Sequence, residues 1–408
     1  MNDQGEVSRV RLGGMLALAM GIGPLSIYVL AALAPAITAE LELSRTQFGA
    51  LASSAYLVTA SLSITVGTIV DRLAPRRVLL ALFLLGAASL GGIALATSYL
   101  VLVIAVIFSG LSQALANPVT NQTVAMMLPA GQRGVMMGIK QSGVQLCQAL
   151  AGLTLPILAV AAGWRAAAMS MPILAVAGIL LTVSVLRKPN VVPTGSGGRG
   201  RRHPSNPLPR AVWWLAGYSV LIGAGLQATN VYVALYAYEF VGLDAVRAGA
   251  TTGLLGGIGV LSRLAWGRAS ERVRTAQFSL ALLAVGGMLA ALLLNLAVSF
   301  PLLIWTGVVV HSLTVVAANV VTMMAVVRSV ELAQLGRASG VIAFGLYLGF
   351  TLGPIAFGAT TDLSGSYGAG WSLVLLGYLG AATLMVLWQR KERRADEVAS
   401  LDEASAHE

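Results

Sequence analysis

The sequence predicts an all-α membrane protein whose twelve transmembrane helices form two pseudo-symmetric six-helix bundles. The first observation is the composition, which is 57% hydrophobic and only 10% charged, whereas soluble domains carry about 25% charged residues. The second is that apolar runs of at least about 18 residues, enough for a helix to cross the hydrocarbon core, recur along the chain. The third is that no run alternates apolar and polar residues as the strands of an outer-membrane barrel do.

Twelve apolar runs give the predicted spans. The first is a retained helix and not a signal peptide, because it is too long for an h-region and ends in "ITAELELSRTQFG" without a small-residue cleavage site. The predicted spans are 12–38, 47–70, 78–97, 100–127, 136–161, 165–186, 211–238, 247–266, 276–297, 301–327, 338–361 and 370–389.

The distribution of Lys and Arg predicts the orientation of these spans. Most of the 26 Lys and Arg residues fall in segments on the same side as the N-terminus, and only Arg45, Arg165 and Arg247 fall on the other side. Because Lys and Arg are enriched in cytoplasmic loops, we expect a multi-pass protein of the cytoplasmic membrane with both termini in the cytoplasm. The net charge of +10 is then a topology signal that requires no nucleic-acid partner.

A polar segment divides the chain into two halves. Residues 187–210, "RKPNVVPTGSGGRGRRHPSNPLPR", are rich in Gly, Pro, Ser and Arg, a composition typical of a flexible linker. We therefore predict an N-terminal six-helix half at 1–186, a cytoplasmic linker at 187–210, a C-terminal half at 211–389 and a charged cytoplasmic tail at 390–408.

A weak internal repeat supports two related halves. The residues Gly67, Asp71 and Arg72 recur 200 positions later as Gly267, Glu271 and Arg272. The glycine spacing after position 138 also recurs after position 340. Paired six-helix halves of this kind are expected of transporters in which one half rocks against the other around a central site.

The stretch "GTIVDRLAPRR" at 67–77 resembles the loop between helices 2 and 3 of the major facilitator superfamily, Gly-x-x-x-Asp-Arg-x-Gly-Arg-Arg. Ala74 replaces the usual glycine and Pro75 stiffens the turn. The resemblance covers nearly the whole chain, including "RGVMMGIKQSG" and "GRASGVIAFGLYLGFTLGP". It implies a twelve-helix secondary carrier working by alternating access. The residues for which it implies a gating role are Gly67, Asp71, Arg72, Arg76, Arg77, Gly267, Glu271 and Arg272; alternatively, the arginines are topology anchors only.

Polar residues inside the spans are the candidates for substrate binding, because they are costly in hydrocarbon and usually face a cavity or a partner. No Asp or Glu lies in the middle of a span, so a buried carboxylate for proton coupling has few possible positions. Two cations without a buried acid, Arg263 and Lys140, favour an anionic substrate, and Arg263 resembles the arginine of some monocarboxylate and oxalate carriers of the superfamily. The predicted binding residues are Arg263, Lys140, Gln141, Tyr28, Asn117, Asn121, Gln227, Asn230, Tyr232 and His311.

Each of these residues also has a structural interpretation. Arg263 and Lys140 lie near the inner ends of their spans, where long side chains can reach the membrane interface. His311 is a titratable residue that could equally serve in packing. Asn117 could satisfy backbone groups freed by Pro118, and tyrosines near helix ends could be interface anchors.

We therefore predict a secondary active transporter of a small solute, an organic anion. An efflux antiporter for drugs or metabolites is the alternative, although Pro156 lacks the preceding Gly of the antiporter motif. A membrane-embedded enzyme or sensor would need a catalytic dyad or a soluble domain, and we see neither. The lone Cys147, three dispersed histidines and no phosphate-binding loop predict no metal and no cofactor. The expected partners are a small-molecule substrate, the lipid bilayer and a coupling ion, and the expected state is a monomer.

Overall fold

The computed structural model describes residues 3–70, 72–186, 207–272, 275–331 and 334–405. Within these ranges the chain is helical and has no strand. The helices of the N-terminal half are α1 (Asp3–Ala32), α2 (Ala34–Glu40), α3 (Arg45–Val70), α4 (Pro75–Ala94), α5 (Tyr99–Met127), α6 (Ala130–Ala162), α7 (Trp164–Met169) and α8 (Pro172–Val185). Those of the C-terminal half are α9 (Arg210–Glu239), α10 (Ala245–Arg272), α11 (Ala276–Leu296), α12 (Leu303–Thr314), the 3-10 turn η1 (Val315–Ala317), α13 (Ala318–Ser329), α14 (Leu335–Ser364) and α15 (Tyr367–Ser405).

These helices make up the twelve predicted crossings, which confirms the predicted fold class. Three crossings are interrupted, namely α1 with α2, α7 with α8, and α12 with η1 and α13. Judged only by length and composition, ten of the crossings in the described residues are long enough and apolar enough to span a membrane. The other two are α3 and α10, which have 26 and 28 residues. Both are rich in small and polar residues, and both lie where the halves meet.

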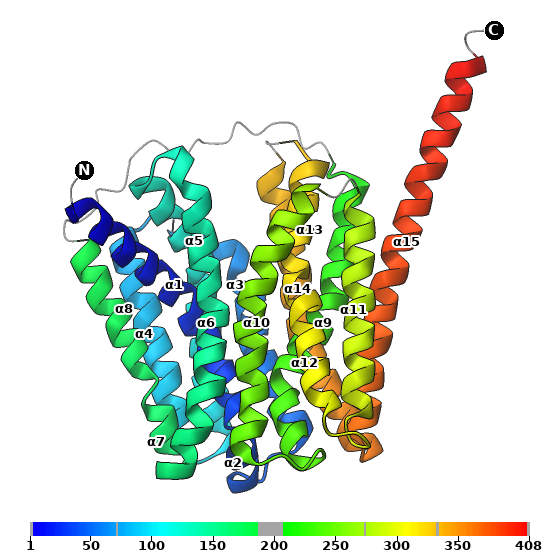
Figure 1. Ribbon diagram of the computed structural model, residues 1–408. Coiled ribbons are helices and arrows are strands. Elements are labelled where there is room, and N and C mark those ends of the chain that lie inside the picture. Colours follow the sequence, from blue (N-terminus) through cyan, green and yellow to red (C-terminus); the bar gives the residue numbers. More distant parts are fainter. Residues whose placement is uncertain (1–2, 71, 187–206, 273–274, 332–333, 406–408) are drawn as a thin grey trace.

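The helix ends agree with the predicted spans to within a few residues, apart from four extensions. Helix α1 begins at Asp3, before the predicted start at 12, and helix α6 begins at Ala130, before the predicted start at 136. Helix α10 continues to Arg272, beyond the predicted end at 266. Helix α15 continues to Ser405, so the described part of the predicted charged tail extends the last crossing as a helix. Figure 1 shows this part of α15 projecting beyond the other helices. Residues 187–206, most of the predicted linker, lie outside the described residues.

The two halves use the same internal packing. In each half the first crossing packs against the fifth, α1 on α6 and α9 on α14. A Cβ atom at Gly143 of α6 would lie 2.0 Å from the Ala17 carbonyl oxygen, and one at its repeat counterpart Gly345 of α14 would lie 2.8 Å from that of Ala216. Only glycine permits such close helix contact. The glycine repeat of the sequence thus marks equivalent contacts in the two halves.

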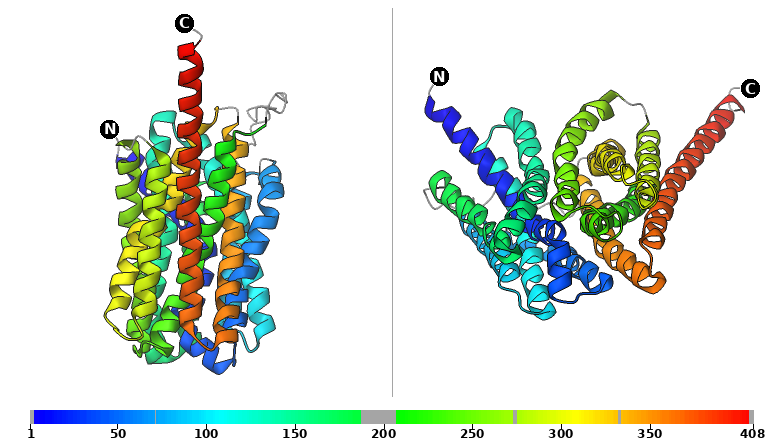
Figure 2. Two further views of the ribbon diagram at one scale, coloured as in Figure 1. Left: turned by 90° about the vertical axis from the view of Figure 1, so that its right-hand side faces the viewer. Right: turned by 60° about the horizontal axis from the view of Figure 1, so that its bottom comes forward.

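The halves lie side by side, with the residues before the linker on one side and those after it on the other (Figure 2). They meet along two seams, α6 with α10 and α3 with α14. We call the end of the bundle opposite the termini, where α2 ends and α7 begins, the far face (Figure 1). Towards this face the seams are tight, because a Cβ atom at Gly152 would lie 2.1 Å from the Gly253 nitrogen. Towards the termini, a Cβ atom at Gly138 or Gly340 would have no atom of the described residues within 4 Å.

Candidate functional site

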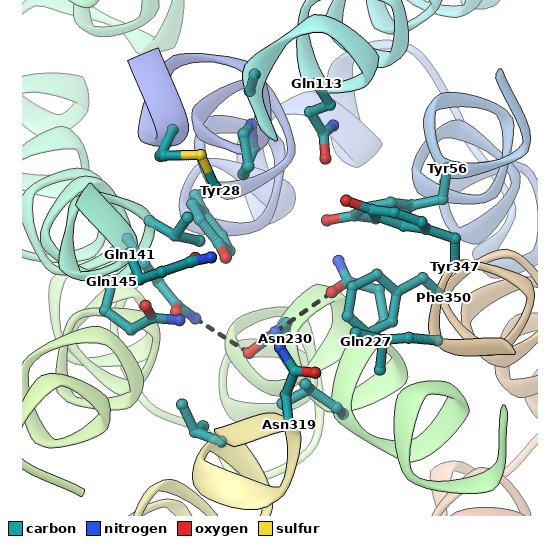
Figure 3. Close-up of a pocket in the computed structure, with 18 of the residues that line it drawn as sticks. Tyr28, Tyr56, Gln113, Gln141, Gln145, Gln227, Asn230, Asn319, Tyr347 and Phe350 are labelled. Atoms are coloured by element: carbon teal, nitrogen blue, oxygen red, sulfur yellow. Dashed lines mark hydrogen bonds between the residues drawn. The ribbon is translucent and has the colours of Figure 1, made fainter. Parts of the chain in front are cut away.

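A central cavity with a volume of about 130 Å³ lies between the halves, about halfway along the seams. Its lining comes from α1, α3, α5 and α6 of the N-terminal half and from α9, α10, η1, α13 and α14 of the C-terminal half (Figure 3). Amides and phenols dominate its polar lining. The polar residues that line it are Tyr28, Tyr56, Gln113, Asn117, Gln141, Gln145, Gln148, Gln227, Asn230, Arg263, Asn319 and Tyr347.

Arg263 is the one cation among the residues that line this cavity. Its Nε donates to the carbonyl oxygen of Val316 at 3.3 Å and its Nη1 to that of Gln141 at 3.5 Å. The 3-10 turn η1 interrupts the crossing at Val316, and the hydrogen bonds within such turns have poorer geometry than those of an α-helix. Among the described residues no carboxylate lies within 4.0 Å of Arg263. Its charge is therefore solvated by neutral oxygens and not neutralised.

A chain of side-chain amides crosses the cavity from one half to the other. Gln148 Nε2 on α6 donates to Asn230 Oδ1 on α9 at 3.0 Å. Asn230 Nδ2 in turn donates to Gln227 Oε1 at 3.3 Å, and both bonds are drawn in Figure 3. These bonds fix the orientation of the Gln227 amide, whose nitrogen points into the open centre.

Aromatic side chains close one side of the cavity. Tyr56 of α3 stacks on Tyr347 of α14 with ring centroids 6.4 Å apart, and it meets Phe350 edge-on at 4.9 Å. Tyr28 of α1 faces them across the open space (Figure 3). The wall spans the α3 and α14 seam, so a movement between the halves would separate these rings.

Six of the ten predicted binding residues lie together in this cavity, contributed by five different helices. They are Arg263, Gln141, Tyr28, Asn117, Gln227 and Asn230. The remaining four, Lys140, Asn121, Tyr232 and His311, do not line it.

Lys140 lies behind the cavity wall, between α5 and α6. It is 1% exposed, and its Nζ donates to Thr120 Oγ1 at 3.0 Å and to Asn121 Oδ1 at 2.5 Å. Thr120 in turn lies 3.6 Å from the sulfur of Met20, which does line the cavity. The ammonium group is thus one layer of side chains away from the space that Arg263 faces. It does not reach the membrane interface.

Tyr232 and His311 have packing roles in this conformation. The Tyr232 hydroxyl donates to the carbonyl oxygens of Arg45 and, at 3.2 Å, of Pro354, so it joins the halves close to the far face. His311 of α12 is buried near Tyr378, with ring centroids 6.4 Å apart.

Several polar and aromatic cavity residues were not among the predicted binding residues, namely Tyr56, Gln113, Gln145, Gln148, Asn319, Tyr347 and Phe350. A periodic signal was available for the three glutamines. Gln113 lies one helical turn before Asn117, and Gln148 continues the face of Gln141 and Gln145. The aromatic residues gave no signal, since aromatic side chains also occur on lipid-facing and packed surfaces of apolar helices.

A cluster of charged and aromatic side chains joins the halves at the far face. We define the far-face cluster as Arg45, Thr46, Glu239, Asp362 and Tyr367. Arg45 Nη2 lies 2.9 Å from Glu239 and its Nη1 lies 3.7 Å from Asp362. Thr46 Oγ1 donates to Asp362 at 2.6 Å, and the Tyr367 hydroxyl donates to Glu239 at 3.0 Å. The cluster ties α3 of one half to α9, α14 and α15 of the other.

The predicted gate is described only in part. Asp71 lies outside the described residues, and the side chains of Glu271 and Arg272 are likewise not described. Gly67 lies near the end of α3 and Gly267 near the end of α10, on the side of the termini. Arg72 follows α3, and Arg76 and Arg77 lie in the first turn of α4. The gating role of these residues therefore stays a prediction.

Comparisons with known proteins agree on one family. A sequence model of the Major Facilitator Superfamily matches residues 16–326. A probable sulfoacetate transporter of Cupriavidus necator, SauU, is 24% identical over 377 residues, which cover 86% of this chain and 88% of that protein. A hexuronate transporter of Bacillus subtilis is 29% identical over 168 residues, or 41% of this chain and 39% of that protein.

Solved structures show the same fold at low sequence identity. A bacterial homologue of the human lysosomal transporter Spinster, in an inward-facing and occupied conformation, superposes with a TM-score of 0.72 at 16% identity. The match covers 94% of this chain and 97% of that one. The nucleoside transporter NupG superposes with a TM-score of 0.73 at 14% identity, covering 93% and 98% of the two chains.

Proposed function

Because this chain belongs to the Major Facilitator Superfamily and is a transporter, we propose that it moves a small organic anion, bound by Arg263 in the central cavity. The cavity lies between two similar helix bundles, where carriers of this architecture bind their substrates. The observation that carries the proposal is the charge of Arg263 in a lining that has no acidic residue.

An anion would gain more from this cavity than a neutral or cationic solute would. Two unit charges about 4 Å apart interact by about 4 kcal/mol at an effective dielectric constant of about 20. A guanidinium group can also hold a carboxylate or sulfonate through two parallel hydrogen bonds. Arg263 has its described bonds to two backbone carbonyls, so an anion would not need to displace an acidic partner.

The relatives are consistent with this substrate class. The two transporters that align with this chain are named for sulfoacetate and for hexuronate, which are both organic anions. These substrates are properties of those proteins. They support an anionic substrate here because the present chain has its own cation in the cavity.

We further propose that the described conformation opens to the cytoplasm. The cavity continues into a groove that shares Gln113, Asn117 and Tyr347 with it and that extends to Trp213 and Arg337 on the side of the termini. The far-face cluster and the tight seams close the opposite side. With the termini in the cytoplasm, as the distribution of Lys and Arg predicts, this is the inward-facing state. The loop at 67–77 and its copy would then close the cytoplasmic side in the outward-facing state.

Binding and uptake by the purified protein test the substrate class. The wild type is compared with Arg263→Gln, Arg263→Lys and the control Arg268→Gln, whose arginine is exposed on the same helix. The probes are small carboxylates and sulfonates on one side and lipophilic cations on the other. We expect Arg263→Gln to weaken anion binding by roughly 30- to 1,000-fold, the usual effect of truncating one partner of a buried charge pair.

Arg263→Lys should keep part of the anion affinity because it keeps the positive charge. It should lose the rest because lysine cannot form the two parallel hydrogen bonds of a guanidinium group. Arg268→Gln should bind like the wild type. Preferential binding of lipophilic cations, with anion binding unchanged in Arg263→Gln, would refute the proposal and would favour the efflux alternative.

A further inference from the structure

We propose that the transported anion is a hydroxylated monocarboxylate, such as a small hydroxy acid or a sugar acid. Arg263 would hold the carboxylate, and Gln145 and Gln227 would hold a hydroxyl group. This inference rests on the proposed function and narrows its substrate class. It is carried by two buried amide atoms in the cavity that have no partner of their own.

The charge of the cavity favours a single negative charge on the substrate. Arg263 is the one cation among the residues that line the cavity. The ammonium of Lys140 lies behind Thr120 and Met20 and already donates to two neutral oxygens. One carboxylate would neutralise Arg263, whereas a second negative charge would be left in the cavity without a cation in contact, which costs free energy.

Gln145 and Gln227 are two buried cavity residues, each with a side-chain polar atom left unpaired among the described residues. Gln145 is 4% exposed and Gln227 is 1% exposed. Gln145 Oε1 and Gln227 Nε2 are buried and have no hydrogen-bond partner among the described residues, although both residues line the cavity. Buried polar atoms are normally paired, so these two are available to a ligand.

The two atoms complement each other chemically. Gln145 Oε1 accepts a hydrogen bond and Gln227 Nε2 donates one. A hydroxyl group is a small uncharged group that both donates and accepts, whereas a methylene group does neither. A polyhydroxylated chain would satisfy both amides, either through one hydroxyl or through neighbouring ones.

The surroundings of these amides fix them in place. The oxygen of Gln227 already accepts from Asn230, so its nitrogen is directed towards the centre of the cavity (Figure 3). The Gln145 side chain packs at Gly259, where a Cβ atom would lie 3.2 Å from Gln145 Cγ. Gly259 is one helical turn before Arg263 on α10. The free acceptor of Gln145 is therefore near the cation that would hold the carboxylate.

A site built to bond a hydroxyl group rejects the analogue that lacks it, because its own polar atoms are then left buried and unpaired. The test measures binding of matched pairs to the purified full-length protein: glycolate with acetate, and gluconate with hexanoate. We expect the hydroxylated member of each pair to bind roughly 10- to 100-fold more tightly. Glycerate should also bind more tightly than its dianionic counterpart, tartronate.

Substitutions of the two glutamines should remove this preference. In Gln145→Leu and Gln227→Leu the affinity ratio between the members of each pair should fall towards one, and Gln145→Met provides an unbranched apolar variant. The control is Gln132→Leu, a glutamine of the same helix α6 that does not line the central cavity. It should keep the wild-type ratio.

The outcomes separate this inference from the proposed function. If no carboxylate binds, the proposed function is wrong and the inference falls with it. If carboxylates bind through Arg263 but the members of a matched pair bind equally, only the hydroxyl inference is wrong. Tighter binding of tartronate than of glycerate would overturn the single-charge part alone.

Discussion

Arg45 and Arg263 both lie where the two halves meet, but their surroundings differ in one respect. Arg45, in the far-face cluster, has two carboxylates from the opposite half within 3.7 Å, and its guanidinium lies 5.1 Å from the ring centroid of Tyr367. Arg263, in the central cavity, contacts backbone carbonyls and is surrounded by neutral amides and phenols. The first arginine is neutralised by the protein, and the second is not.

This difference shows how one residue type can serve two functions in a carrier. An arginine that has acidic partners on the other half stabilises the closed state of the far face. An arginine in an acid-free cavity favours the state that contains an anion. In the proposed cycle the far-face bonds break whenever that face opens. Both ion pairs are partly exposed, so each contributes only modestly to the stability of the closed state.

The largest effect is expected from preventing closure of the far face without touching either arginine. In Gly152→Val the new side chain would start 2.1 Å from the Gly253 backbone nitrogen, and backbone atoms cannot move aside as a flexible side chain can. Transport should fall by roughly 100-fold or more, since overpacking costs about 1–3 kcal/mol even where neighbours can adjust. Uptake into proteoliposomes measures the loss.

The matched control for this substitution is Gly257→Val on α10, because a Cβ atom at Gly257 has no atom within 4 Å. A cysteine at Phe48, a buried residue of α3 whose ring packs against Tyr232 of α9 in the other half, reports on closure through its labelling rate. Normal transport by Gly152→Val would mean that this close contact is not needed in the cycle.

Giving Arg263 an acidic neighbour should convert the cavity into a region like the far-face cluster. Gln141 lines the cavity and its carbonyl oxygen accepts from Arg263, so Gln141→Glu places a carboxylate close to the guanidinium. Repulsion between two negative charges about 6 Å apart is about 3 kcal/mol at an effective dielectric constant of about 20. Anion affinity should fall roughly 30- to 100-fold by isothermal titration, whereas Gln132→Glu should have little effect. An unchanged anion affinity in Gln141→Glu would mean that the charge of Arg263 is not what selects the substrate.

Removing the charge of Arg45 should weaken the closure of the far face and leave the substrate-binding cavity intact. In Arg45→Gln, Glu239 and Asp362 lose their cation, and the far face should open more readily. Because the pairs are partly exposed, we expect roughly a 3- to 10-fold increase in labelling of the cysteine at Phe48, and a smaller effect at high salt. Substrate affinity should change less than in Gln141→Glu.

Arg247 provides the control for the Arg45 variant. It also lies at the far face, but its ion pair is with Asp244, three residues away in the same half. Arg247→Gln should therefore label like the wild type. An Arg45→Gln protein that labels like the wild type would show that the glycine seams alone hold the far face closed.

The smallest effect is expected for an ion pair that lies within one half. A hydrogen bond from Trp164 and the interactions with Arg165 hold the pKa of Glu40 below its usual value. Its contribution to stability is therefore present above the unfolded pKa of about 4.5 and is lost as the pH falls through the lower folded pKa. Glu40→Gln should lower the Tm slightly at pH 7, and the difference from the wild type should shrink in acid.

Glu42→Gln, at an exposed residue of the same connection, is the control for Glu40. Transport by Glu40→Gln should match that of the wild type, because α2 and α7 belong to the same half and are expected to move together. A loss as large as that of Arg45→Gln would mean that this pair also takes part in closure.

Much of this architecture could be read from the sequence. The lengths of the apolar runs predicted the twelve crossings, because each run must cross a hydrocarbon layer of fixed thickness. The glycine repeat after positions 138 and 340 predicted two related halves, and it now corresponds to the same helix contact in each. Arg263 could be selected because a cation without an acid is rare inside a span.

What the sequence did not determine was the direction in which each side chain points and what lies next to it. Lys140 and Gln141 are consecutive, yet one lies behind the wall and the other lines the cavity, because successive residues of a helix point about 100° apart. Arg45, Glu239 and Asp362 are separated by more than a hundred residues each, and only the packing of α3 against α9 and α14 unites them. Hydrophobicity is a local property and fixes which segments cross the membrane. The rotation of each helix and the choice of its neighbours depend on contacts between distant segments, so only the tertiary structure decided which arginine has acidic partners and which faces the open cavity.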